Sequence, residues 1–357
     1  MASHGVPRQG PVGVRTAEDV QKELKEIEEY RELERSVHQR ISERQYTPET
    51  LQKTSDLLKK NPEYYTIWNY RRLIRQHQFS LAMPESPDQS GIDQIMAIIE
   101  TDLEFLVPLL RRFPKCYWIW YYRLWILDEA KRLLPGHVAR RFWQNELILV
   151  GKMLNADSRN FHGWGYRRFV VQALEDLKPD EEGTMTQAEL DYTTKMIGAN
   201  LSNFSAWHNR TKLIQKLLRE KSASDEERKK MLDEELNLVH RALIDPYDQS
   251  LWFYHQNLMA TFDPTLSAQT IAPNLSNAER LEYIQKEKEA IEDMLEGAED
   301  CKWIYQALIY CNLLAAKIEG AMSPEAKADV LRWLNELMKL DPLRRGRWLD
   351  LENSLKR

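Results

Sequence analysis

The stretch KCYWIWYYRLW, from Lys115 to Trp125, contains the pattern that decides the fold. Pro114 precedes Trp120 by six residues, Tyr117 precedes it by three, and Arg123 follows it by three. The same frame recurs around six further tryptophans, more loosely around the last three: Trp68, Trp164, Trp207, Trp252, Trp303 and Trp348. A frame that returns along the whole chain is typical of a repeat protein.

Each copy of the frame has the pattern of two helices joined by a tight turn. An Asn or Asp stands seven residues before the tryptophan in five copies: Asn61, Asp157, Asn200, Asp245 and Asp341. Proline follows it in three of these copies, and a capping residue with proline ends one helix and starts the next within a few residues. Apolar residues at helical spacing precede the turn, as in Trp143, Leu147, Val150 and Leu154. The sequence therefore predicts antiparallel helix pairs.

The seven tryptophans are 43 to 52 residues apart, which is longer than the tetratricopeptide period of about 34. Four polar or Pro-rich segments are expected to be surface loops: Ser80 to Asp93, Asp176 to Thr186, Arg219 to Asp225, and Asp263 to Ala278. We predict an all-α fold, a curved, right-handed solenoid of seven antiparallel helical hairpins that forms one domain over residues 16–357. Residues 1–15 are expected to be a disordered lead.

The charged run from Thr16 to about Arg44 predicts a first helix, with the Thr16 hydroxyl as its cap. Such a helix is either solvated and packed by one narrow apolar stripe, or it docks on a partner subunit. The sequence alone leaves both interpretations open.

Composition excludes several classes of function. The net charge of −5 provides no basic field for a nucleic acid, and no run of about 18 apolar residues predicts a membrane span. The three cysteines form no CxxC pair, which fits a reducing, cytoplasmic compartment. No metal-ligand spacing or phosphate-binding glycine loop occurs, so we expect no metal site in this chain and no self-sufficient enzyme.

Two positions in the frame carry polar residues of interest. An arginine three residues after the tryptophan is best explained by stacking between repeats: Arg71, Arg123, Arg167 and Arg210. The residue five positions before the tryptophan varies, and we expect it at the rim of the repeat: Glu63, Lys115, Arg159, Ser202 and Tyr247. Lys115, beside Tyr117 and Tyr121, is either a solvated lysine or a cation for a phosphate-bearing substrate.

The N-P-x-x-Y-x-x-W-x-x-R frame resembles the protein prenyltransferase α-subunit repeat, over essentially the whole chain after about residue 45. Asp157 to Val170 and Asp245 to His255 look like the α subunit of Rab geranylgeranyltransferase (type II). His4-Gly5 resembles the Met-His-Gly opening of such subunits, displaced along the chain. The length resembles the compact form, without the immunoglobulin-like domain and leucine-rich repeats of larger animal subunits.

This resemblance implies a crescent of hairpins around a β subunit that carries the zinc ion and most of the isoprenoid pocket. The family pattern P-K-x-Y-x-x-W-x-x-R-x-W is matched from Pro114 to Trp125. It implies that Lys115 is the catalytic cation near the isoprenoid diphosphate and that Tyr117 is its neighbour at the subunit interface. Asn160 and His162, in the next repeat's equivalent turn, are further candidates for this rim.

The function implied is that of the α subunit of a heterodimeric Rab geranylgeranyltransferase, active only with its β subunit. The enzyme would transfer geranylgeranyl from geranylgeranyl diphosphate to C-terminal cysteines of Rab GTPases presented by an escort protein. Two alternatives stay open, namely the α subunit shared by farnesyltransferase and geranylgeranyltransferase type I, and a non-catalytic helical-repeat scaffold.

Overall fold

The structure is a computed structural model that describes residues 16–83, 89–179, 182–266 and 270–356. Every regular element in these four ranges is a helix, and no strand occurs in them. The predicted all-α class is therefore confirmed. The predicted disordered lead, including His4, lies outside the described residues.

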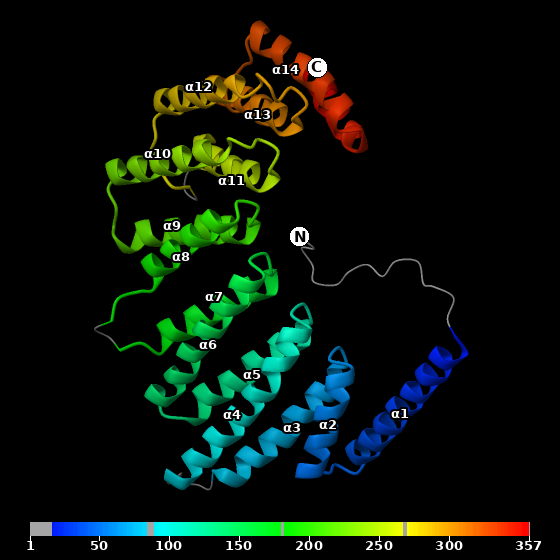
Figure 1. Cartoon of the computed structure of the whole chain (residues 1–357). Helices are drawn as coiled ribbons and strands as arrows, with labels where there is room; N and C mark the ends of the chain where they lie inside the picture. Colours follow the sequence, from blue (N-terminus) through cyan, green and yellow to red (C-terminus); the bar gives the residue numbers. More distant parts are fainter. Residues whose placement is uncertain (1–15, 84–88, 180–181, 267–269, 357) are drawn as a thin grey trace. The chain divides into compact units, whose positions relative to one another are not determined.

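The helices divide into two compact units, Met1–Gly183 and Thr184–Arg357, and each is described by itself. The first unit contains α1 (Ala17–Ser42), α2 (Pro48–Lys60), α3 (Tyr65–Ala82), α4 (Gln89–Arg112), α5 (Tyr117–Leu133), α6 (Gly136–Ala156) and α7 (Phe161–Asp176) (Figure 1). The prediction of one continuous domain from residue 16 to 357 stays a prediction.

The second unit begins with α8 (Thr186–Ala199), α9 (Phe204–Glu220), α10 (Asp225–Ala242), α11 (Gln249–Met259) and the 3-10 helix η1 (Ala260–Phe262). It continues with α12 (Asn277–Asp293), α13 (Lys302–Glu319), α14 (Pro324–Leu340), the 3-10 helix η3 (Pro342–Arg344) and α15 (Arg345–Lys356). From α2 to α15 each even-numbered helix packs on the odd-numbered helix that follows it, which confirms the predicted hairpins.

The turns at Asn61 and Asp157 end the first helix as predicted, but the Asn or Asp does not cap the second helix. Asn61 is the C-cap of α2, and its side-chain oxygen accepts the backbone N–H of Glu63 at 3.2 Å. Asp157 closes the end of α6 in the same way, by accepting from the N–H of Arg159 at 3.2 Å. The Asn or Asp therefore ends the first helix and holds the turn as an Asx turn. The second helix has its N-cap three residues later, at Asn160 for α7.

The anchor tryptophans fix this turn from inside. The Trp120 indole N–H donates to the carbonyl oxygen of Pro114, six residues earlier, at 2.9 Å. Four other indoles make the equivalent bond at 2.6 to 2.9 Å: Trp68, Trp164, Trp207 and Trp252. The bond matters because a buried indole N–H or carbonyl without a partner is costly. Each anchor thus holds the start of its own helix against the turn.

In the sixth hairpin the anchor is a tyrosine, which corrects the placement at Trp303. The Tyr305 hydroxyl donates to the carbonyl oxygen of Glu299, six residues earlier, at 2.8 Å. Trp303 is only half-buried and lies two residues before this position. Cys301 then occupies the N-cap position that Cys116 has in the second hairpin. The Tyr305 phenol reaches the carbonyl at the position that an indole reaches in the first five hairpins. The assignment of Trp303 as the sixth anchor was therefore wrong.

Neighbouring hairpins are joined by buried charged side chains. Arg123 donates through Nε and Nη2 to the Glu146 carboxylate at 2.7 and 2.6 Å, and the Tyr166 hydroxyl donates to it at 2.6 Å. The same three-residue arrangement occurs twice more, as Arg71, Asp102 and Tyr122, and as Arg210, Glu235 and Tyr254. The arginine belongs to one hairpin, and the carboxylate and tyrosine belong to the next. These contacts confirm the stacking interpretation for these arginines.

The first helix is capped as predicted, because Thr16 and Asp19 form a capping box at the start of α1. Its first half is exposed on all sides, whereas Val37 in the second half is buried. The Tyr30 hydroxyl accepts a bond from the Asn61 amide at 3.0 Å, which ties α1 to the end of α2. These contacts fit a solvated helix that packs by a narrow stripe.

The predicted loops differ from the structure in one place. The predicted loop from Ser80 to Asp93 is helical at both ends, because α3 continues to Ala82 and α4 begins at Gln89. Ser80 is helical, with its hydroxyl donating to the His77 carbonyl at 2.7 Å, and the Gln89 side-chain amide donates to Asp93 at 2.9 Å in the first turns of α4. The other three predicted loops agree with the helix ends to within two residues, where the structure describes them.

Candidate functional site

Lys115 lies in the turn between α4 and α5, at the exposed rim that the sequence predicts. Its side chain is 38% exposed, and Nζ is 3.7 Å from Asp157 Oδ2 in the turn that leads to α7. An ion pair with this much solvent exposure is weak. The ammonium can therefore exchange Asp157 for a stronger anion without a large loss of free energy.

Tyr117 opens α5 directly beside this turn and is 54% exposed. Its ring is stacked on Tyr121 with a centroid distance of 5.8 Å, and it meets His162 edge-on at 6.2 Å. Trp118 contacts both tyrosine rings edge-on. Aromatic side chains with this much exposed surface are characteristic of interaction sites.

His162 stands in the first turn of α7 and is the third candidate that the structure places near Lys115. Burial lowers the pKa of His162, and the nearby Lys115 ammonium lowers it further, whereas the Glu63 carboxylate opposes this shift. The ring is therefore neutral at pH 7. It can donate or accept one hydrogen bond at the rim but does not add a second cation there.

Asn160 is buried, and its role in the structure is positional. Its side-chain oxygen caps α7 by accepting the N–H groups of His162 and Gly163 at 3.0 and 3.3 Å. Its amide nitrogen donates to the Pro114 carbonyl at 3.0 Å. Because Pro114 directly precedes Lys115, this bond ties the turn that carries the lysine to the next hairpin. Asn160 thus supports the rim from below and contributes no exposed atom to it.

A groove of about 600 Å³ adjoins Tyr117 and His162 along the second helices of this unit. Arg72 lies over the rings of Tyr121 and Trp125, at 4.9 and 5.4 Å from their centroids. Phe161 adds further exposed aromatic surface at the start of α7. Neither Arg72 nor Phe161 was predicted as a site residue. The signal for Phe161 was present, since it stands three residues before its anchor, as Tyr117 does.

No group of three or more His, Cys, Asp or Glu side chains in the described ranges is arranged to hold a metal ion. None of the helices described here is both long enough and apolar enough to cross a membrane.

Comparison with known proteins places the hairpins in a family. The model of the protein prenyltransferase alpha subunit repeat matches residues 48–78, 99–130, 143–174 and 186–217. These four ranges correspond to the hairpins α2–α3, α4–α5, α6–α7 and α8–α9. A solved Candida albicans protein geranylgeranyltransferase-I complexed with GGPP is similar at a TM-score of 0.62 and 21% identity, over 92% of this chain and 91% of that one. That likeness supports the fold.

Relatives similar over their whole length decide the family. The geranylgeranyl transferase type-2 subunit alpha of Schizosaccharomyces pombe is 33% identical over 344 residues, which cover 94% of this chain and 93% of the relative. The protein of the same name from Dictyostelium discoideum is 33% identical over 363 residues, covering 97% and 99%. Both matches confirm the resemblance to the compact form. The chain belongs to the family of geranylgeranyl transferase type-2 α subunits.

Proposed function

We propose that this chain is the α subunit of a Rab geranylgeranyltransferase and acts together with a β subunit. The enzyme transfers geranylgeranyl from geranylgeranyl diphosphate to C-terminal cysteines of Rab GTPases presented by an escort protein. The observation that carries this proposal is the exposed rim, where the Lys115 ammonium lies beside Tyr117 and the neutral His162. A cation next to uncovered aromatic rings suits a site that a second subunit completes.

The need for a partner is supported by the surface of the second helices. The residue three positions before the anchor is aromatic and exposed in four hairpins, namely Tyr65, Tyr117, Phe161 and Phe204. Aromatic side chains are enriched at protein interfaces because they bury a large area and lose little rotamer freedom. We assign these rings to the contact with the β subunit.

Lys115 has a defined role in the proposed transfer. The sulfur of the acceptor cysteine forms a bond to C1 of the geranylgeranyl chain while the C1–O bond breaks. The electron pair of that bond leaves with the diphosphate, and the Lys115 ammonium stabilises the charge that develops there. We assign the zinc ion to the β subunit, as the family resemblance implies, where it would hold the acceptor cysteine as a thiolate.

The two alternatives are less well supported. The relatives described above are type-2 α subunits, which favours that enzyme over the α subunit shared by farnesyltransferase and geranylgeranyltransferase type I. The position of Lys115 at the aromatic rim favours a catalytic subunit over a scaffold. We further assign the enzyme to the cytoplasm, because Cys116, Cys301 and Cys311 are all free thiols.

The test is to produce the chain with a type-2 β subunit and measure geranylgeranyl transfer to a Rab GTPase with its escort protein. Lys115→Ala is expected to lower the turnover rate about 100-fold, as the loss of one donor to a developing anion does. Lys115→Arg keeps the charge and is expected to recover part of the rate. The thermal stability of the heterodimer should stay unchanged, since the Lys115–Asp157 pair is exposed.

Lys59→Ala is the matched control, because Lys59 is also an exposed lysine paired with an aspartate, Asp56 at 3.2 Å, and lies on a first helix. It should leave turnover intact. Full turnover of the Lys115→Ala enzyme would remove the catalytic role of Lys115. Failure to bind any type-2 β subunit would overturn the proposed function itself.

A further inference from the structure

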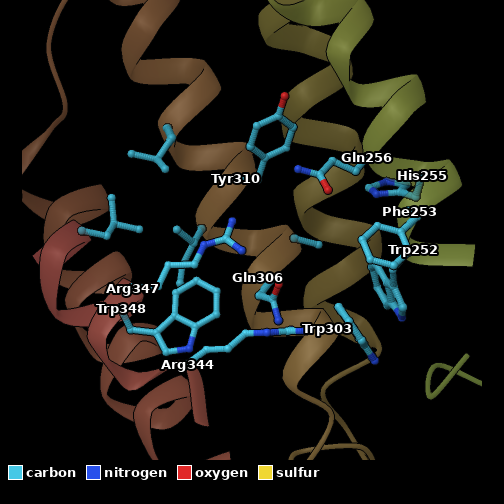
Figure 2. A pocket seen from close by; sticks show the side chains of 14 residues that line it. Trp252, Phe253, His255, Gln256, Trp303, Gln306, Tyr310, Arg344, Arg347 and Trp348 are labelled. Carbon is cyan, nitrogen blue, oxygen red and sulfur yellow. The ribbon is translucent and has the colours of Figure 1, made fainter. Parts of the chain in front are cut away.

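The second unit contains a pocket of about 340 Å³ whose walls come from α11, α13, η3 and α15. Figure 2 shows the rings of Trp252 and Phe253 on one side of it and that of Trp348 on the other. Phe253 is 44% exposed, so the aromatic wall is accessible from solvent. No residue of the rim around Lys115 lines this pocket, and the proposed activity does not use it.

The indole of Trp348 has lost the partner that the anchor tryptophans in the first five hairpins have. In the first five hairpins the indole N–H donates to the carbonyl six residues earlier, but Trp348 Nε1 is buried without a hydrogen-bond partner. The equivalent carbonyl, that of Pro342, instead accepts the backbone N–H of Arg345. The 3-10 helix η3 replaces the usual turn, and the bond from the Arg345 N–H to the Pro342 carbonyl closes this helix. Trp348, which lines the pocket, therefore carries a buried N–H donor without a partner.

A second buried donor and two cations lie at the same pocket. Gln306 Nε2 on α13 is also buried without a partner. Figure 2 shows Gln306 and Arg344 next to the Trp348 indole, and the Arg347 guanidinium points toward the middle of the pocket. Arg344 is 51% exposed and has one acidic neighbour, Asp341 at 3.6 Å. The Trp348 indole, Arg344 and Arg347 can only donate, and Gln306 Nε2 is a donor as well, so these groups together favour an acceptor with negative charge.

The volume of the pocket and the residues of its walls limit the kind of ligand that it can bind. A volume of about 340 Å³ is at the small end of ligand pockets, which span about 300–1,000 Å³. It holds one large apolar side chain with a small polar group. The aromatic rings provide the surface for that side chain, and the guanidinium groups with the two neutral donors suit a carboxylate.

We propose that this pocket binds a peptide carboxylate that adjoins an apolar or aromatic side chain, as at the C-terminus of a partner protein. The carboxylate accepts hydrogen bonds from Trp348 Nε1 and Gln306 Nε2 and pairs with Arg347. The side chain packs between the ring of Trp348 and those of Trp252 and Phe253. The site shares no residue with the Lys115 rim.

The test titrates the full chain with N-acetylphenylalanine, and in parallel with its neutral amide. The acid is expected to bind at least tenfold more tightly than the amide, because the amide removes the charge that the arginines recognise. The indole N–H resonance of Trp348, assigned by its absence in Trp348→Phe, should shift with the acid. Arg347→Gln should weaken binding of the acid about tenfold.

Arg332→Gln is the matched control. Arg332 also lies beside a tryptophan ring, at 5.9 Å from Trp333, but it does not line this pocket. Its replacement should leave the affinity for N-acetylphenylalanine unchanged. Equal affinity for acid and amide, no saturable binding, or equal loss in both arginine variants would overturn the proposal. Inorganic diphosphate binding as tightly as the acid would also overturn it, since the site would then recognise an anion without its side chain.

Discussion

Two joints between hairpins occupy the same place in the repeat but use different chemistry. In the first unit Arg123, three residues after its anchor, is paired with the buried carboxylate of Glu146 in the next hairpin. In the second unit the residue three after the anchor is His255, and it is bonded to Glu287 at 2.9 Å. A second histidine, His240, is bonded to the same carboxylate oxygen at 2.9 Å. One joint has a permanent cation, and the other has two titratable rings.

The difference shows what the repeat requires at this position. In both joints a buried carboxylate from the next hairpin must be compensated, because an unpaired buried charge is costly. Burial alone would lower the pKa of Arg123, but the Glu146 carboxylate raises it, so this cation stays charged. Burial alone would raise the pKa of Glu287, but the hydrogen bonds from His240 and His255 lower it to about 2. Both joints therefore place a hydrogen-bond donor against a buried carboxylate, but only the histidine joint is expected to change with pH.

The largest effect is expected from breaking the arginine joint. Arg123→Met leaves the Glu146 carboxylate buried without its cation, and the chain should lose about 3–5 kcal/mol of unfolding free energy. The double variant Arg123→Met with Glu146→Leu removes both charges and should recover most of that loss. Urea unfolding of the three proteins, followed by circular dichroism, measures this. A double variant as unstable as the single one would show that the pair itself provides the stability.

A smaller effect is expected from the tyrosine that completes the same joint. Tyr166→Phe removes the hydroxyl that donates to Glu146 at 2.6 Å but leaves both bonds from Arg123. The expected cost is about 1.5–3 kcal/mol, the range for one hydrogen bond to a charged acceptor. Tyr254→Phe is the control in the second unit, since Tyr254 donates to Glu235 at 2.5 Å. Unequal losses in the two variants would mean that the joints are not equivalent.

Much of the fold could be predicted from spacing alone, as the hairpins α2–α3 and α4–α5 illustrate. The Asn or Asp with the proline after it marks the end of a first helix and the turn that follows, as at Asn61 and Pro62, and this information is local. The sixth anchor was misplaced because Trp303 and Tyr305 are both aromatic donors near the right spacing. The spacing of six residues to the Glu299 carbonyl belongs to Tyr305, whereas Trp303 matched only in residue type.

The candidate site was predictable to a lesser degree. The rim position of Lys115 follows from comparing copies, because a structural position repeats its residue type and a rim position varies. Asn160 looked equally exposed in sequence, yet it caps α7 and donates to Pro114 from a different hairpin. A contact between residues 46 apart is a property of the stacked repeats. The catalytic role of Lys115 and the interface role of Tyr117 stay predictions.

The smallest effect is expected from titrating the histidine joint, and its sign follows from the two pKa shifts. The hydrogen bond to Glu287 raises the pKa of His240 above 6.5, although burial opposes this. Stability from His240 is therefore complete below pH 6.5 and is lost as pH rises through the raised pKa. Stability from Glu287 is present above pH 4.5 and is lost as pH falls toward 2. The joint is strongest between these limits, so the chain should be less stable at pH 8 than at pH 6.

His240→Gln isolates this contribution, because glutamine keeps a donor for Glu287 but does not titrate. Between pH 6 and pH 8 this variant should lose less unfolding free energy than the unchanged chain does. The difference between the two losses should be smaller than the cost of Tyr166→Phe. The urea midpoint at the two pH values measures it. His38→Gln is the matched control, since His38 is an exposed histidine bonded to Tyr64 at 2.7 Å and belongs to the first unit. If both variants changed the pH dependence equally, the histidine joint would not be its source, and the two joints would differ in composition only.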